Sequence, residues 1–172
     1  MRTLSGKTRY AFLLFFLTHI PITMMIDAQA FIPQRFFASP IRELFKWYCF
    51  RFKDSLMTAP HDVWIQAVIA CECFLQIPFF FYAVYALWSP DKIDGRGNFR
   101  SACLIYGSHT ATTLVPILAC ISQDQATIFL EKVVLLFFYF PYLIFPLWLV
   151  FIASVSEDIF GVEISGLKLK DK

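Results

Sequence analysis

Long apolar runs alternate with short polar segments along the whole chain. The four runs cover residues 10–32, 63–88, 99–121 and 133–155. Each is close to the roughly 20 residues that an α-helix needs to cross the hydrocarbon core of a bilayer. The pattern therefore predicts an all-α integral membrane protein, a bundle of four transmembrane helices. Every run contains proline, which predicts kinked helices with space for a cavity between them, at Pro21, Pro78, Pro116, Pro141 and Pro146.

A shorter segment, residues 39–56, has a different pattern, in which aromatic and basic residues alternate. The aromatic residues are Phe45, Trp47, Tyr48, Phe50 and Phe52, and the basic ones are Arg42, Lys46, Arg51 and Lys53. Ser39 is suited to cap a helix and Pro40 to occupy its first turn. We expect an amphipathic helix at the lumenal membrane interface, which either covers the end of the bundle or only anchors it.

The beginning of the chain permits a second interpretation, a cleaved signal peptide. Arg2, Lys7 and Arg9 precede the first apolar run, which ends in Ala28-Gln29-Ala30. That run is longer than the roughly 7–15 apolar residues of a signal core. We therefore expect it to be retained as the first helix, in a single membrane domain spanning 1–172 with a tail at 156–172.

Composition narrows the class of protein further. Of the 172 residues, 58% are hydrophobic and 16% are charged, and the net charge is only +2. No stripe of basic residues suited to nucleic-acid phosphate is present, so we expect no nucleic-acid partner. No HExxH, GxSxG, glycine-rich phosphate loop or Cys/His metal spacing occurs, and we expect no metal and no cofactor.

The distribution of basic residues predicts the orientation. Nine Lys and Arg lie at the termini and in the 89–100 segment, and six lie on the other side. By the positive-inside rule, both termini are then cytosolic. Lys168 and Lys170, the fifth and third residues from the end, resemble a dilysine retrieval signal of the endoplasmic reticulum. A solvated basic tail is the alternative interpretation.

Two carboxylates, Asp27 and Glu72, lie inside apolar runs, where an isolated charge costs roughly 2.5–3.5 kcal/mol. At 1.5 Å per residue, we place both in the lumenal half of the bundle, at the depth of Gln76, Thr113 and Tyr139. Close acids in a low dielectric do not both ionise, so we expect Glu72 to hold a proton. Such a pair could neutralise a cationic ligand or transfer a proton, or it could only link helices.

His19 and His109 also lie in apolar runs. Each is more typical of an interhelical hydrogen bond than of a catalyst.

Several segments together resemble one family in order and spacing. These are 18–30, containing Asp27, then 46–54, 72–80, 109–118 and 139–142. They are similar to the EXPERA family, and in particular to its receptor-type branch. The resemblance implies a four-helix protein of the endoplasmic reticulum, often a homodimer, whose cavity opens to the bilayer and takes sterols or hydrophobic amines.

The resemblance also implies residue roles. Asp27 would be the counter-ion of a ligand amine, and Glu72 would be the acid that is hydrogen-bonded to Asp27. Asp54 would be a structural anchor of the lumenal segment. Other residues would line the pocket: Gln76, Thr113, Tyr139, Tyr142, His19, Trp47 and Tyr48. The partners implied are a sterol or cationic amphiphile, the lipid bilayer, a second copy of the chain and sterol-transport membrane proteins.

Three functions remain open from the sequence. The first is binding of sterols and hydrophobic amines, in sterol homeostasis or transport. The second is a sterol Δ8–Δ7 isomerase that uses Asp27 and Glu72, although family isomerases carry a histidine shortly before the first acid, where this chain has Met25. The third is an interaction or quality-control factor for membrane or organelle-targeted proteins.

Overall fold

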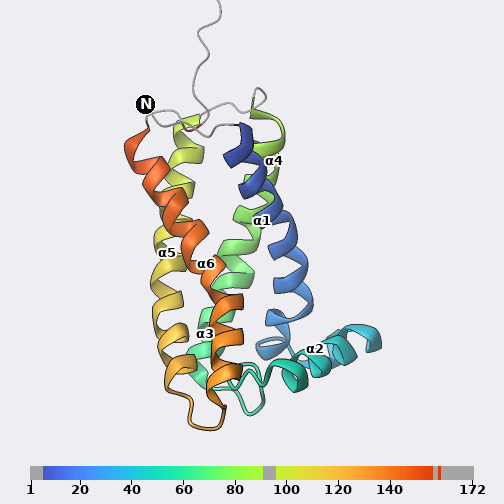
Figure 1. The fold of residues 1–172 in the computed structure, drawn as a ribbon. Helices are drawn as coiled ribbons and strands as arrows, with labels where there is room; N and C mark the ends of the chain where they lie inside the picture. Colours follow the sequence, from blue (N-terminus) through green and yellow to red (C-terminus); the bar gives the residue numbers. More distant parts are fainter. Residues whose placement is uncertain (1–5, 91–95, 157–158, 160–172) are drawn as a thin grey trace, which may run out of the picture.

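The computed structural model describes residues 6–90, 96–156 and 159, and within them it contains helices and no strands (Figure 1). Four segments are long and apolar enough to cross a membrane: Gly6–Ala30, Val63–Trp88, Asn98–Gln123 and Phe129–Val155. The predicted all-α bundle of four transmembrane helices is therefore confirmed. The first and last described helical ends lie at one end of the bundle, opposite α2 (Figure 1).

The first membrane segment is not one continuous α-helix. Helix α1 (Gly6–Met25) continues through Pro21 but ends at Met25, and a 3₁₀ segment (Asp27–Ala30) follows. The Gln29 amide donates to the carbonyl of Met25 at 2.6 Å and to that of Ile41 at 3.1 Å. It thereby satisfies a carbonyl at the helix end that has no partner within the helix. The segment expected over 10–32 therefore consists of an α-helix followed by a 3₁₀ segment, within a candidate membrane span of Gly6–Ala30.

The second membrane segment widens at its centre. Helix α3 (Val63–Cys71) passes into a π-helical turn (Glu72–Gln76) and then into α4 (Ile77–Trp88). Pro78 lies in the first turn of α4 and has no N–H for the carbonyl of Phe74, so a regular α-helix is interrupted there. The widened turn brings Glu72 and Gln76 to the same cavity.

Helices α5 (Arg96–Gln123) and α6 (Phe129–Val155) pack tightly together in the region of Gly107. A Cβ atom at Gly107 would lie 2.5 Å from Cγ2 of Val150 and 2.8 Å from the carbonyl oxygen of Pro146. Only glycine therefore permits this approach of the two helices. Helix α6 begins before residue 133 because Glu131 accepts a hydrogen bond from the backbone N–H of Ile128 at 3.1 Å.

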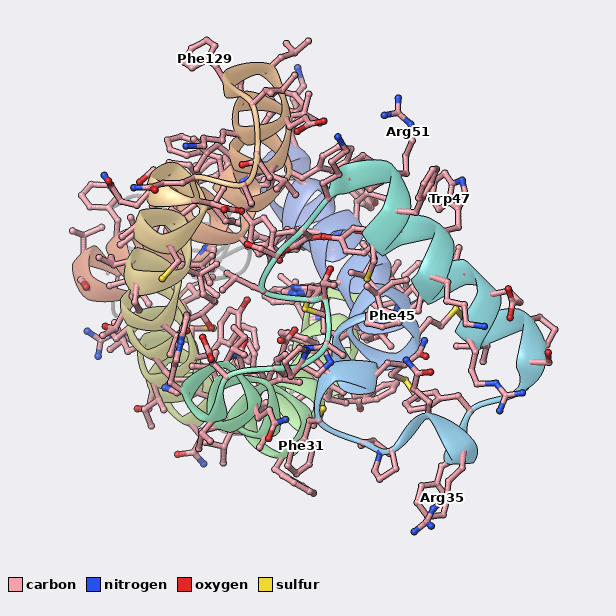
Figure 2. The ribbon with its side chains drawn as sticks, turned by 90° about the horizontal axis from the view of Figure 1, so that it is seen from below. Phe31, Arg35, Phe45, Trp47, Arg51 and Phe129 are labelled. Carbon is pink, nitrogen blue, oxygen red and sulfur yellow. The ribbon has the colours of Figure 1, made fainter. Side chains whose placement is uncertain are left out.

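Helix α2 (Ser39–Phe52) crosses the end of the bundle and projects beyond it (Figures 1 and 2). Phe45 points toward the bundle and is buried, whereas Arg51 points away. The N-cap is Ala38 and not Ser39, and its side chain makes no capping hydrogen bond. Because the helix begins at Ser39, Pro40 is its second residue. Proline has no backbone N–H, so one of the donors that an N-cap side chain could bind is absent.

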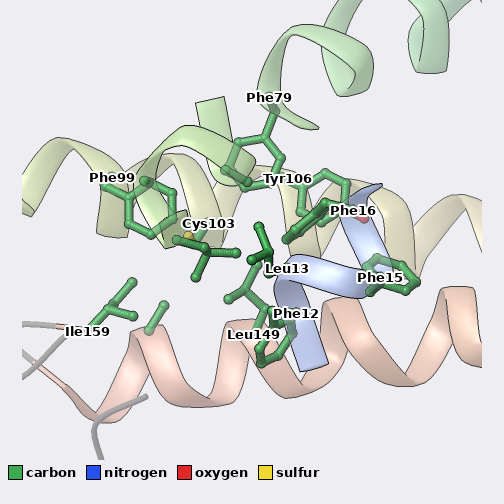
Figure 3. Packing of buried hydrophobic residues seen from close by; sticks show 14 of the residues in the cluster. Phe12, Leu13, Phe15, Phe16, Phe79, Phe99, Cys103, Tyr106, Leu149 and Ile159 are labelled. Atoms are coloured by element: carbon green, nitrogen blue, oxygen red, sulfur yellow. The ribbon is translucent and has the colours of Figure 1, made fainter. Parts of the chain in front are cut away.

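The interior is divided into two clusters of different character. The cluster far from α2 is built from aromatic rings and is close-packed (Figure 3), and it includes Phe12, Phe16, Phe80, Phe99, Tyr106 and Leu149. The cluster near α2 is mainly aliphatic, and it includes Ile26, Ile65, Ile69, Leu114 and Ile117. Large apolar side chains also cover the outside of the helices, as lipid contact requires, among them Leu14, Phe81, Ile105 and Phe137.

Candidate functional site

A cavity of about 320 Å³ lies inside the aliphatic cluster, under the C-terminal half of α2. This volume is within the range of small-molecule sites. Its lining includes all the residues that the sequence analysis expected in a pocket: Asp27, Glu72, Gln76, Thr113, Tyr139, Tyr142, His19, Trp47 and Tyr48. The structure thus brings them together, although their role in binding a ligand stays a prediction.

Glu72 lies next to two residues of α1. Its Oε1 atom accepts a hydrogen bond from the Thr23 hydroxyl at 2.6 Å and lies 3.4 Å from Nε2 of His19. The side chain of Glu72 is 15% exposed and lines the cavity. The acid is therefore fixed from one side and accessible from the other.

Asp27 has a different environment from Glu72. It is the first residue of the 3₁₀ segment and lines the same cavity. No hydrogen bond or ion pair joins its carboxylate to another described residue. A carboxylate in an apolar site is stabilised by a cation or by donors, and no described residue provides either one to Asp27.

Asp54 lies just after α2 and is completely buried, and its carboxylate accepts three hydrogen bonds. They come from the hydroxyls of Tyr48 at 2.8 Å and Tyr139 at 2.7 Å, and from the backbone N–H of Leu56 at 3.1 Å. Burial, followed by the nearby Asp54 charge, raises the pKa of Tyr48 well above its usual range. This geometry ties α2 to α6, and it means that the two tyrosines present their rings to the cavity while their hydroxyls bind Asp54.

Gln76 is another polar residue that lines the cavity, in addition to Asp27 and Glu72. The Thr110 hydroxyl donates to its Oε1 atom at 3.1 Å. Thr113 donates instead to the carbonyl of Thr110 at 3.0 Å, so its hydroxyl hydrogen is already used within α5. Gln76 and Thr110 are both almost fully buried, which fixes the amide at the wall of the cavity.

Comparison with known proteins agrees with this geometry. The profile of EXPERA (EXPanded EBP superfamily) matches residues 40–153. The chain belongs to the EXPERA family. The match contains Glu72, Gln76 and Asp54, whereas Asp27 and His19 precede it. The family expected from the sequence is confirmed.

Individual EXPERA relatives resemble most of the chain. Sigma intracellular receptor 2 of Homo sapiens is 36% identical over 146 residues, 77% of this chain and 79% of the receptor. That of Xenopus tropicalis is 34% identical over 148 residues, 81% of this chain and 84% of the receptor. Efficient mitochondria targeting-associated protein 19 of Saccharomyces cerevisiae is 27% identical over 115 residues, 65% of this chain and 71% of that protein.

The cavity of this EXPERA protein reaches the molecular surface at one side. Four of its lining residues are also exposed, to between 38% and 55%: Ile22, Leu44, Trp47 and Phe138. They come from α1, α2 and α6, and all are apolar or aromatic. An apolar opening of this kind suits a ligand that arrives from the hydrocarbon core of the membrane.

Some functional candidates were missed by reasoning from the sequence, and some lie elsewhere. Thr23 and Thr110 were missed, although Thr23 follows His19 and precedes Asp27 by four residues each, a spacing that places all three on one helical face. His109 does not line the cavity, and its Nε2 atom has no hydrogen-bond partner among the described residues. Lys168 and Lys170 lie outside the described residues.

Within residues 6–90, 96–156 and 159, no three His, Cys, Asp or Glu side chains lie close enough together to hold a metal ion.

Proposed function

We propose that this protein binds sterols and hydrophobic amines inside the membrane and acts in sterol homeostasis or transport. The observation that carries the proposal is the carboxylate of Asp27, which lines an apolar cavity of about 320 Å³ and binds no described residue. A protonated amine placed beside it would replace the missing partner. In a low dielectric this interaction is much stronger than in water.

The remaining lining supports a ligand of amphiphilic shape. Aliphatic side chains of Ile65, Ile69 and Ile117 offer the apolar surface that a sterol ring system needs. The ring of Tyr142 and the indole of Trp47 line the same space and could attract an ammonium group by cation–π interaction. The opening between α1, α2 and α6 would admit such a ligand from the bilayer.

We place this function in the membrane of the endoplasmic reticulum, with both termini cytosolic, α2 on the lumenal side and the protein as a homodimer. The support is the distribution of basic residues, the dilysine-like Lys168 and Lys170, and the family resemblance. The sterol-transport membrane proteins expected as partners belong to the same proposal.

Sterol isomerisation is the second candidate, and one observation favours it. Glu72, Asp27 and the imidazole of His19 line one cavity, with His19 3.4 Å from Glu72. An acid, a base and a histidine are sufficient to add a proton at one carbon and remove it at another. Met25, where family isomerases carry histidine, is exposed and does not line the cavity, which favours binding over turnover.

An interaction or quality-control role is the third candidate. Its support is the name of the yeast relative, which refers to mitochondria targeting. This role predicts co-purifying protein partners that persist when Asp27 or Glu72 is replaced.

One experiment separates these functions. Equilibrium binding of a labelled hydrophobic amine and of a Δ8-sterol is measured for the wild type, Asp27→Asn and Glu72→Gln, and the bound sterol is then analysed chemically. We expect amine binding to collapse in Asp27→Asn and the sterol to be recovered unchanged. Conversion to a Δ7-sterol that is lost in Glu72→Gln would identify an isomerase. Binding that neither substitution affects would refute the proposal.

A further inference from the structure

The two oxygens of the Glu72 carboxyl have different surroundings. Oε1 lies 2.6 Å from the Thr23 hydroxyl and 3.4 Å from Nε2 of His19. No hydrogen bond joins Oε2 to another described residue. Because both contacts converge on Oε1, Oε2 is the oxygen that remains for the cavity.

Thr23 uses its hydroxyl in an unusual way for a helical threonine. Threonine in a helix commonly donates to a carbonyl three or four residues earlier. Thr18, Thr112 and Thr113 do so, with distances of 2.9, 2.7 and 3.0 Å. Thr23 instead donates across the bundle to Glu72, as Thr110 does to Gln76, and it is completely buried, so bulk water does not compete for this hydrogen.

His19 lies close to the same oxygen, with its Nε2 atom 3.4 Å from Oε1. Its ring is held between Phe80 and Tyr142, with centroid distances of 4.5 Å to each, so it has little freedom to turn. Its Nδ1 atom is buried without a partner among the described residues. A hydrogen on Nε2 gives an N–H···O contact with Oε1, whereas the other tautomer would leave two lone pairs facing each other.

We propose that Thr23 is a positioning residue for the acid proton of Glu72. The Thr23 hydroxyl keeps Oε1 as the hydrogen-bond acceptor, so the proton of the neutral carboxyl lies on Oε2 and is donated into the cavity. The inference rests on the proposed function and on the expectation from the sequence that Glu72 is the neutral member of the acid pair. Thr23 does not itself line the cavity and acts through Glu72.

The position of this proton gives the cavity a preference among ligands. The oxygen of a sterol hydroxyl has lone pairs that accept the Glu72 proton. A protonated tertiary amine has no lone pair and gains its affinity from the charge of Asp27. Loss of the Thr23 hydroxyl should therefore weaken sterol binding more than amine binding.

The test is infrared spectroscopy of the purified protein. The carbonyl stretch of the neutral Glu72 carboxyl is assigned as the band that Glu72→Gln removes. We expect this band to move to higher frequency in Thr23→Val, because the carbonyl oxygen loses a hydrogen bond, and to return in Thr23→Ser. Thr18→Val, which changes an exposed threonine of the same helix, should leave it in place. Thr23→Ala is the second variant if valine prevents folding.

Ligand binding gives an independent readout. In Thr23→Val we expect sterol affinity to fall about tenfold, the equivalent of one hydrogen bond, and amine affinity to change less than about threefold. A band that does not move, the absence of any band that Glu72→Gln removes, or equal loss of both ligands would overturn the inference. Amine binding that survives Asp27→Asn would refute the proposed function and leave the infrared result unaffected.

Discussion

The two halves of the bundle use the same four membrane segments for opposite purposes. In the half far from α2, aromatic rings interlock: Phe79 and Tyr106 stack at 4.4 Å, and Phe16 packs against both. In the half near α2, aliphatic side chains and polar groups surround about 320 Å³ of unfilled space. The aromatic half far from α2 therefore contributes stability by close packing. The half near α2 is less closely packed and contains the cavity.

The difference has a cause in the backbone as well as in the side chains. The π-helical turn at Glu72–Gln76 and the end of α1 at Met25 both lie beside the cavity. Such interruptions widen the spaces between helices, and π-turns are frequent at functional sites. The comparison predicts that substitutions in the filled half change stability, while those in the hollow half change binding.

The largest effect on stability is expected for Phe80→Ala. Phe80 is completely buried in the filled half, where its ring packs against Phe16 and His19. Removal of a fully buried phenylalanine costs about 3–5 kcal/mol. Thermal unfolding in detergent should show a large loss of melting temperature. An unchanged melting temperature would contradict the description of this half as close-packed.

A matched pair of additions sharpens the comparison. Ala83→Phe inserts a ring where a completely buried alanine leaves no space, and such overpacking costs about 1–3 kcal/mol or more. Ile69→Phe inserts nearly the same ring beside the cavity. We expect Ile69→Phe to keep the wild-type stability and to lose ligand binding. An equal loss of unfolding free energy in the two variants would contradict the presence of empty space beside Ile69.

Gly107→Ala tests the close contact between α5 and α6. Its Cβ atom would meet Val150 and the backbone of Pro146, and the backbone does not yield as a flexible side chain does. We expect a loss of about 1–2 kcal/mol, near the lower end of the range for overpacking. Measurement of unfolding for Gly107→Ala and Gly107→Ser should give similar losses. Stability equal to the wild type would show that the two helices separate without cost.

The smallest effect is expected at the outer edge of the hollow half. Lys53 follows α2 and forms an ion pair with Glu131 at the start of α6. The Lys53 side chain is 59% exposed, and exposed pairs contribute about 0–1 kcal/mol. Lys53→Met should therefore change the free energy of unfolding less than any of the destabilising substitutions above. Asp54→Asn, which disturbs the neighbouring buried anchor, should cost clearly more.

Much of this arrangement could be predicted from the sequence. Apolar runs identify the membrane segments because the bilayer requires a minimum helix length. The depth of Asp27, Glu72, Gln76 and Tyr139 follows from the rise per residue, and the structure places all four at one cavity. Asp54 was expected as an anchor, and its three hydrogen bonds agree with that role.

Other features could not be predicted, because they depend on contacts between distant residues. The end of α1 is set by the Gln29 side chain, which binds carbonyls of Met25 and Ile41. The Thr23 hydroxyl could have donated within its own helix, as that of Thr18 does, and only packing directs it to Glu72. The cavity depends on how side chains from several helices pack together, and a local sequence pattern does not determine this packing.

The central claim is that Asp27 gives the hollow half its affinity for cations. The most direct test measures the dissociation constants of a hydrophobic amine and of its uncharged carbon isostere for the wild type and Asp27→Asn, with the exposed Glu43→Gln as control. We expect the amine to lose about 30-fold or more in Asp27→Asn, as for other buried charge pairs, and the isostere to change little. Equal changes for both ligands would contradict the account.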